Sequence, residues 1–359
     1  MNVESDLLIE SMARLFADLA PSTAPGWEEA LASRSMQLRA REQVSTSGLP
    51  DLLVGQEANG FGGGWSDAGA IFGLAGSEAL PYPVVESVLA NGLLHEAGLL
   101  AVAGTTIGRA DSSQVSLTDS TFTGTVKAVP WASHCEAVVL QVGSKIVLLR
   151  IANRAGVVSR RNLAGESRDD LIFEAVQPIA VGYLPEGALS LELRGAIART
   201  AQIAGALESV LSMTCDYVRT RQQFGRPLSG FQAIQQQIAV LAAETAAVGC
   251  AAVAVGKSAA ERRSQSTVAF EIIAAKLRAN EAAGIAASTA HQIHGAMGIT
   301  SEYKLHLFTR RLWSWRGEFG NDAYLKRELT GLIRGLGADR FWQFLTTMDP
   351  VDFGQVAPN

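Results

Sequence analysis

The spacing of apolar residues divides the chain into helical, strand-rich and again helical stretches. Residues 1 to about 98 follow a helical period, because apolar side chains recur three and four positions apart: Leu7, Leu8, Met12, Leu15 and Phe16. The glycine-rich stretch GLPDLLVGQEANGFGGGWSD (48–67) interrupts this pattern and predicts a loop. Helical spacing resumes after it and is broken at Pro81 and Pro83. We therefore expect an N-terminal helical domain over residues 1–98.

Residues 99–183 have a different pattern. Short segments rich in β-branched residues alternate with Gly, Ser, Asp and Asn: LLAVAG, QVSLT, TFTGTVKAV, AVVLQV and KIVLLRI. Such runs are typical of strands separated by turns. The sequence predicts a middle antiparallel β domain over residues 99–183.

From residue 184 the helical period returns and persists. One apolar stripe keeps a spacing of three and four residues: Leu193, Ile197, Thr200, Ala204, Leu207, Leu211, Cys215 and Val218. A second helix is expected from Phe231 to the Arg262-Arg263 pair, and a third from Ser264 towards His291. Long helices with short connections predict a four-helix bundle over residues 184–359, ending in a loose tail, DPVDFGQVAPN. The predicted fold class is α+β.

Composition narrows the classes of function. The chain has 359 residues, 48% of them hydrophobic and 18% charged, so it is long and apolar enough to build more than one packed core. A formal net charge of −5 and the lack of long basic tracts argue against nucleic acid as the main partner.

The cysteines and the N-terminus indicate a cytoplasmic protein. Three scattered cysteines, Cys135, Cys215 and Cys250, make no disulfide framework, and the five histidines have no metal-ligand spacing. We therefore expect no metal site. The N-terminus carries acids where a signal peptide needs positive charge, and no segment is expected to span a membrane.

The stretch RTRQQFGRPLSGFQAIQQQIA (219–239) carries the first candidate chemistry. Gly225 and Pro227 explain why a helix ends there and another begins near Phe231. They do not explain the arginines around Phe224 or the glutamines that follow. Arginines beside an aromatic ring suit a ligand with phosphates and a ring that can stack.

A second stretch, QIHGAMG (292–298), ends the third long helix. Gln292 is followed by Gly295 and Gly298, which allow a ligand to approach the backbone closely. A glycine-rich helix stop explains the same letters, so this motif alone is weak evidence for a site.

Taken together, the two stretches resemble the acyl-CoA dehydrogenase family. The pattern RxxFGxPLxxFQAIQ, followed sixty residues later by QIHGAMG, is similar to that family's bundle domain. The loop GLPDLLVGQEANGFGGG resembles the family's GLxxLxVPExxGGxG, and the order of helical, β and bundle domains matches as well. The resemblance covers most of the chain and is strongest over residues 190–320.

The resemblance implies an FAD cofactor shared between subunits. In the family, FAD extends its ADP half into a neighbouring subunit, which supplies the motif residues named above. The positions that match here are Arg221, Phe224, Gln232, Gln292 and Gly295, with Ala296 in place of a second glycine. The resemblance therefore implies at least a dimer, homomeric or heteromeric.

The resemblance also implies an acyl-CoA thioester substrate and a glutamate base. In the family a glutamate removes the α-proton while hydride leaves the β-carbon for the flavin N5. Aligned on RRLWSWRGEFGND, this base falls on Glu318. Some members place it at the start of the helix that leads to RxxFG, which here is Gly195, and Glu192 lies three residues away. Glu318 is therefore the candidate base.

The middle domain departs from the family pattern. The TEPxAGSD segment is absent, its place being taken by LLAVAGTTIGRADSSQ, and the domain is shorter than usual. The WITN segment that flanks the flavin reads KAVPWAS, so Trp131 and Ser133 are the candidate flavin contacts in a shifted register. These features are similar to the shorter subunit of heteromeric bacterial acyl-CoA dehydrogenases that act on steroid side-chain CoA thioesters.

Several functions stay open at this point. The chain is an FAD-dependent acyl-CoA dehydrogenase, alone or in a heteromer, or a non-catalytic partner subunit that lends FAD-binding residues. A flavin monooxygenase on the same fold is a third hypothesis, and a cofactor-free bundle protein a fourth, which leaves both motifs unexplained. The resemblance implies an electron-transferring flavoprotein as the electron acceptor. The acyl group is not specified by the sequence.

Overall fold

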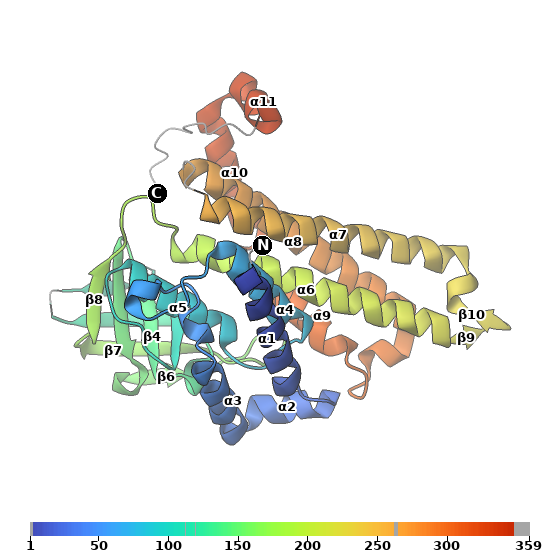
Figure 1. The fold of residues 1–359 in the computed structure, drawn as a ribbon, viewed down its shortest axis with the longest axis horizontal. Coiled ribbons are helices and arrows are strands. Elements are labelled where there is room, and N and C mark those ends of the chain that lie inside the picture. Colours follow the sequence, from blue (N-terminus) through green and yellow to red (C-terminus); the bar gives the residue numbers. More distant parts are fainter. Residues whose placement is uncertain (1–2, 112, 119, 262–264, 348–359) are drawn as a thin grey trace. The chain divides into compact units, whose positions relative to one another are not determined.

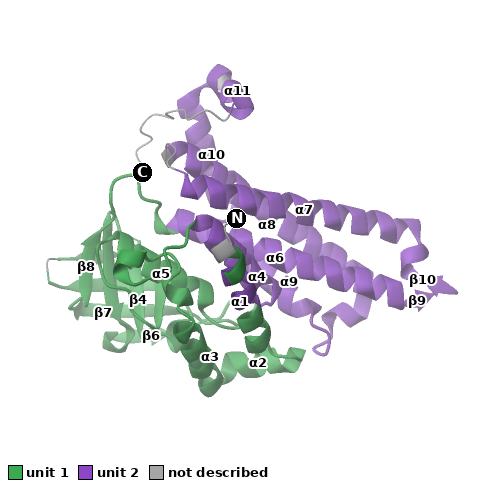
Figure 2. Ribbon diagram, viewed as in Figure 1, with its two compact units in different colours: residues 1–7, 14–64, 80–191 green, residues 8–13, 65–79, 192–359 purple. Residues whose placement is uncertain are grey.

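The computed structural model describes residues 3–111, 113–118, 120–261 and 265–347, and Figure 1 shows the ribbon. The predicted loose tail lies outside the described residues. The chain divides into two compact units (Figure 2): unit 1 contains residues 1–7, 14–64 and 80–191, and unit 2 contains residues 8–13, 65–79 and 192–359. The three domains expected from the sequence stay a prediction.

Helices precede the strands, as predicted. They are α1 (Val3–Leu19), α2 (Ala24–Ala32), α3 (Arg34–Thr46), α4 (Trp65–Ser77) and α5 (Val84–Glu96). Hydroxyl groups cap two of them: Thr23 Oγ1 accepts the Gly26 N–H at the start of α2, and Ser33 Oγ accepts the Met36 N–H at the start of α3. The predicted loop at 48–67 holds two short 3-10 turns, and α4 begins within it at Trp65.

The strands of unit 1 form one eight-stranded sheet. Their bounds are β1 (Thr105–Arg109), β2 (Val115–Leu117), β3 (Phe122–Pro130), β4 (Ala137–Val142), β5 (Lys145–Arg150), β6 (Gly156–Val158), β7 (Arg168–Val176) and β8 (Ala180–Tyr183). The order is β6-β7-β3-β1-β4-β5-β8, with β2 paired to β3. The strand predicted at LLAVAG is wrong, since the first strand begins only after this segment.

The sheet is mixed, which corrects the expectation of a purely antiparallel domain. β1 and β4 pair in parallel, with Thr105 opposite Ala137, whereas the remaining pairs are antiparallel. A parallel pair needs a crossover connection, and here the β2–β3 segment provides it. Side chains from these strands build the core of unit 1, where Phe122 and Phe173 meet edge to face with their ring centroids 5.8 Å apart.

Unit 2 is dominated by three helices of 30, 29 and 30 residues, as the sequence predicts. They are α6 (Leu191–Thr220), α7 (Gln232–Ala260) and α8 (Gln265–His294), followed by α9 (Leu305–Trp315), α10 (Asp322–Leu336) and α11 (Ala338–Thr347). Glycines let α4 approach α6 closely. A methyl group on Gly205 would lie 1.9 Å from the Gly73 carbonyl oxygen, and one on Gly76 would lie 2.1 Å from that of Gln202. Larger side chains at these positions would force the helices apart.

The helix α7 bears on the expectation that no segment spans a membrane. Among the described residues it is the one helix with the length and apolar composition of a membrane span, and only 22% of its most apolar window is buried. A single such helix is weak evidence for a membrane protein. Leu241, Thr245 and Val248 are buried on one face, and Glu244 forms an ion pair with Arg278 of α8. α7 therefore packs in the bundle and leaves much apolar surface open.

A buried lysine joins α8 to the ends of α9 and α10. Lys276 is fully buried, and its Nζ donates to Asn280 Oδ1 and to the Trp315 carbonyl, the latter at 3.0 Å. Asn280 Nδ2 donates to the Gly320 carbonyl at 3.3 Å and to Asp322 Oδ1 at 2.9 Å. Burial lowers the pKa of Lys276 to about 7, although the nearby carboxylates favour its charged form.

This lysine makes the stability of the protein depend on pH. Between pH 7 and 10.5 the unfolded chain carries the proton on Lys276 and the folded chain does not, so unfolding is disfavoured as the pH rises. Relative to Lys276→Met, the wild-type free energy of unfolding should rise from pH 7 towards pH 10, by at most about 1.4 kcal/mol per pH unit. Urea titrations at each pH measure the difference. The exposed Lys257→Met is the control, and parallel profiles for wild type and Lys276→Met would contradict the prediction.

Candidate functional site

The first predicted motif forms a small hairpin at one end of the bundle. After α6, β9 (Gln222–Gln223) pairs with β10 (Arg226–Pro227) in antiparallel fashion. The two residues between the strands, Phe224 and Gly225, both have left-handed backbone angles, with φ of 53° and 77°. Two such residues make the tight turn that suits a two-residue hairpin. This turn explains why the helix stops and why glycine follows the phenylalanine.

The side chains of this hairpin face outward. The ring of Phe224 is 89% exposed, and Arg221 and Gln232 are exposed as well. The neighbouring Arg226 instead stacks on Phe231, with its guanidinium carbon 4.0 Å from the ring centroid. A largely exposed aromatic ring contributes little to folding, so the ring of Phe224 is accessible to a ligand or partner.

The second predicted motif lies at the end of α8. The helix stops at His294, and Gly295 follows with φ of 56°, as a left-handed residue commonly does at a helix C-terminus. Gln292 and Gly295 are exposed, and nothing lies within 4 Å of the position that a methyl group on Gly295 would occupy. The backbone is therefore open to a close approach.

Aromatic contacts bring the two motifs to the same end of unit 2 (Figure 1). Tyr217 near the end of α6 stacks on His294 at the end of α8, with ring centroids 4.4 Å apart, and its hydroxyl donates to the His294 carbonyl at 3.3 Å. Burial lowers the pKa of His294, so its ring is neutral at pH 7. Its Nδ1 donates to the Ala290 carbonyl, which leaves Nε2 to accept from the Tyr303 hydroxyl. These contacts fix the relative position of the motifs.

The electrostatics of this end suit an anion. Arg221 follows α6, and its carbonyl accepts the Leu228 N–H at 2.9 Å shortly before α7, whereas Arg219 forms an ion pair with Asp216 at 3.6 Å. The N-cap residue of α7 is Phe231, which provides no side-chain cap, so the positive end of this helix is not neutralised by a side-chain oxygen. We call the five predicted residues here the bundle-end surface: Arg221, Phe224, Gln232, Gln292 and Gly295.

The predicted base lies elsewhere in unit 2. Glu318 follows α9, and its Oε2 accepts from both Nε and Nη2 of Arg199, each at 2.8 Å. Arg199 is 2% exposed and Glu318 18%, so the ion pair is largely shielded from water. The opposite charge favours the ionised carboxylate. The structure does not test whether Glu318 accepts a proton from a substrate, and this role stays a prediction.

The bundle-end surface and Glu318 lie far apart along α6. Thr220, at the end of the helix, comes 21 residues after Arg199. At about 1.5 Å per residue this separation is roughly 30 Å. One small group cannot touch both, so within a single chain the two sets of residues serve different parts of a ligand or different ligands.

The two predicted flavin contacts in unit 1, Trp131 and Ser133, differ in their exposure to solvent. Trp131 is 2% exposed, has φ of 57°, and donates its backbone N–H to the Ser167 carbonyl at 3.0 Å. Arg168 covers its ring, at 6.0 Å from the centroid. Ser133 is exposed, and its hydroxyl lies 3.0 Å from His134 Nδ1. Trp131 therefore packs inside unit 1, whereas Ser133 is accessible; the role of both in flavin binding stays a prediction.

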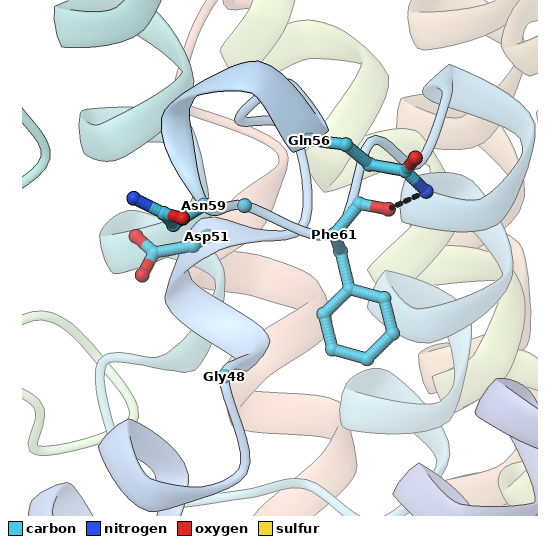
Figure 3. A pocket seen from close by; sticks show the side chains of 6 residues that line it. Gly48, Asp51, Gln56, Asn59 and Phe61 are labelled. Carbon is cyan, nitrogen blue, oxygen red and sulfur yellow. Dashed lines mark hydrogen bonds between the residues drawn. The ribbon is translucent and has the colours of Figure 1, made fainter.

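Unit 1 also has a hollow in the predicted loop at 48–67. It has a volume of about 460 Å³ and is lined by Gly48, Asp51, Gln56, Asn59, Gly60 and Phe61. Figure 3 shows the labelled lining residues, among which Gln56 Nε2 donates to the Phe61 carbonyl at 3.5 Å. Asp51 accepts a hydrogen bond from the buried Asn91 of α5 at 2.6 Å. The sequence predicted no ligand residue here.

Sequence reasoning missed Arg199, which pairs with the predicted base. Arg199 is one of several charged residues of α6, and the sequence alone does not say that Arg194 and Arg199 are buried. Metal binding has no support in the described part of the chain, where no three His, Cys, Asp or Glu side chains gather closely enough to hold an ion.

Comparisons with known proteins point to one family. Residues 192–329 match the family model of the acyl-CoA dehydrogenase C-terminal domain. Acyl-CoA dehydrogenase IpdE2 of Mycobacterium tuberculosis is 37% identical over 116 residues, which cover 32% of this chain and 34% of that protein. Acyl-CoA dehydrogenase FadE34 of the same organism is 26% identical over 350 residues, covering 92% of this chain and 48% of its own length. The matches thus span between a third and a half of these relatives.

A solved structure agrees along nearly the whole chain. The crystal structure of the ChsE4-ChsE5 complex from Mycobacterium tuberculosis superposes with a TM-score of 0.80 at 20% identity, covering 94% of this chain and 99% of that one. At 20% identity, this structural similarity establishes the fold of the chain and nothing beyond the fold. The resemblance seen in the sequence is thereby confirmed: residues 192–329 match the model of the acyl-CoA dehydrogenase C-terminal domain, and the chain has the acyl-CoA dehydrogenase fold.

Proposed function

We propose that this chain is a subunit of an FAD-dependent acyl-CoA dehydrogenase and lends its bundle-end surface to FAD held mainly by another subunit. The observation that carries the proposal is the exposure of this surface, above all the 89% exposed ring of Phe224 beside Arg221. Its distance of roughly 30 Å from Glu318 along α6 supports a ligand that enters from outside the chain.

The residues of the bundle-end surface fit an extended dinucleotide. Arg221 can neutralise phosphate charge with a planar, multidentate group, and Phe224 offers a ring face for stacking. The amides of Gln232 and Gln292 both donate and accept hydrogen bonds, as ribose hydroxyls and an adenine edge require. Gly295 leaves the backbone open to a close approach. FAD, when bound, supplies the acceptor for the two electrons that leave the acyl chain.

Unit 1 gives weaker support for a flavin held by this chain itself. Trp131 presents only 2% of its surface, so it cannot flank a flavin ring without moving. This observation favours a partner subunit that lends residues over a self-sufficient dehydrogenase. The self-sufficient enzyme, with Glu318 as base, is the second candidate, favoured by a carboxylate that is 18% exposed and thus not fully sealed.

A second chain is part of the proposal. The structurally similar ChsE4-ChsE5 protein is a complex of two different chains. The open apolar surface of α7 offers an area that association would cover. We propose a heteromer with a longer homologue, an acyl-CoA thioester as substrate, an electron-transferring flavoprotein as acceptor, and the cytoplasm as location. The absence of a disulfide among the three free cysteines, Cys135, Cys215 and Cys250, supports this location.

The first test is the flavin content per chain. Purified alone, the chain should hold well below one FAD per chain, measured as visible absorbance against total protein. Co-expressed with a longer homologue, it should form a complex with one FAD for each pair of chains. One tightly bound FAD per isolated chain would reject the lending role and restore the self-sufficient dehydrogenase.

The second test removes the proposed phosphate contact. Arg221→Ala should weaken FAD binding to the complex by about 10- to 100-fold, because a hydrogen bond to a charged group contributes roughly 1.5–3 kcal/mol. Fluorescence titration of the apo-complex with FAD measures the change. Arg327→Ala is the matched control, since this exposed arginine of α10 lies outside the bundle-end surface and pairs with Glu328. Equal affinities of the Arg221→Ala and Arg327→Ala complexes would count against the proposed site.

A further inference from the structure

The residue after the predicted base has a strained backbone. Phe319 is 6% exposed and has φ of 51°, in the left-handed region that bulky side chains rarely adopt. Such a conformation persists only where the surroundings over-determine it, and it marks candidate functional positions. The contacts around Phe319 therefore need a physical account.

The ring of Phe319 fills the space beside Gly195. This glycine is the fifth residue of α6, where glycine destabilises a helix relative to alanine. A methyl group on Gly195 would lie 2.1 Å from two carbon atoms of the Phe319 ring and 2.6 Å from a third. No alanine fits while the ring is there. The contact with the Phe319 ring therefore explains why position 195 is a glycine.

Arg199, one helical turn after Gly195, contacts both Phe319 and Glu318. Its guanidinium carbon lies 5.6 Å from the Phe319 ring centroid, and two of its nitrogen atoms lie 2.8 Å from Glu318 Oε2. A further nitrogen donates to Gln202. Because Arg199 is 2% exposed, its charge needs a partner inside the protein, and the seated ring places that carboxylate next to it.

The backbone on both sides of Glu318 is also held. Lys276 donates to the carbonyl of Trp315, and Asn280 donates to the carbonyl of Gly320. Both donors are fully buried on α8. The turn that carries Glu318 is thus fixed before it, after it and through its side chain, which leaves the carboxylate little freedom to reach towards another group.

We propose that Gly195 and Phe319 are positioning residues that commit the Glu318 carboxylate to Arg199 as a structural counter-ion. Glu318 then does not act as the proton acceptor of a dehydrogenation. The geometry comes from unit 2 alone, whereas the reaction named rests on the proposed function.

Thermal unfolding of the full chain tests the packing of the Phe319 ring against Gly195. Gly195→Ala should lower the Tm in the wild-type background, because the methyl group displaces the ring. In a Phe319→Ala background the same substitution should raise the Tm, because the space is free and alanine favours the helix. Gly331→Ala in α10, where a methyl group meets nothing within 4 Å, is the control and should raise the Tm slightly in both backgrounds. If Gly195→Ala changes the Tm in the same direction in both backgrounds, the proposed packing of the Phe319 ring against Gly195 is wrong.

The role of Glu318 is tested by removing its charge. Glu318→Gln should lower the Tm, because it removes the carboxylate charge that lies 2.8 Å from the buried Arg199, and adding Arg199→Met should recover part of the loss. No loss of Tm in Glu318→Gln would overturn the counter-ion role.

Turnover of the flavin-loaded complex separates the counter-ion from a base. At a temperature where the variant is folded, Glu318→Gln should keep turnover of octanoyl-CoA within a few-fold of wild type. A loss of about 100-fold or more, as expected for a lost general base, would overturn the inference. A complex that binds no flavin would reject the proposed function. The Tm measurements on the single chain would still test whether Phe319 packs against Gly195 and whether Glu318 is the counter-ion of Arg199.

Discussion

The burial of the Arg199 charge is the constraint around which unit 2 is arranged. A guanidinium that is 2% exposed cannot be hydrated, so the protein must bring a carboxylate to it. That carboxylate is Glu318, in the turn between α9 and α10. To hold this turn in place, Phe319 adopts a strained left-handed backbone conformation. Its ring packs against position 195, where only a glycine leaves enough space. One charge on α6 thus determines the path of the chain some 120 residues later, since Glu318 lies 119 residues after Arg199.

The continuity of α6 explains why the bundle has two separate chemical regions. A helix of 30 residues is stiff, so the region around Arg199 and the hairpin at the C-terminal end stay roughly 30 Å apart. The N-terminal half faces inward and is saturated with internal contacts. The C-terminal end carries side chains that folding does not bury. The difference in burial, more than the identity of the residues, indicates which region has to meet another molecule.

Much of the fold could be predicted from the sequence, because the long helices have strong periodic patterns. The bounds expected for α6, α7 and α8 agree with the structure within a few residues. The sheet was harder. LLAVAG is apolar enough for a strand, but glycines with left-handed backbones flank it at Gly98 and Gly104, and Leu100 is 85% exposed. The parallel pairing of β1 with β4 depends on contacts between segments distant in sequence, which local patterns do not encode.

The candidate site shows the same division. The break between α6 and α7 and the stop at the end of α8 could be predicted from glycines and a proline, since turn geometry is a local property, whereas the hairpin within the break was not predicted. The ion pair of Glu318 could not, because its partner Arg199 looks like an ordinary helical residue. Burial of Trp131 likewise became apparent only with the sheet around it. Local chemistry was predictable, whereas partnerships across the chain were not.

Sharing a flavin between two chains would couple cofactor binding to assembly. A ligand that contacts both partners binds the complex more tightly than either chain, so its free concentration raises the stability of the complex by mass action. Flavin would in this way favour association, and association would complete the flavin site. Under the proposed function, a chain that holds the Glu318 carboxylate on Arg199 and buries Trp131 would depend on its partner for the reaction. In such an assembly the exposed ring of Phe224 would become a buried contact.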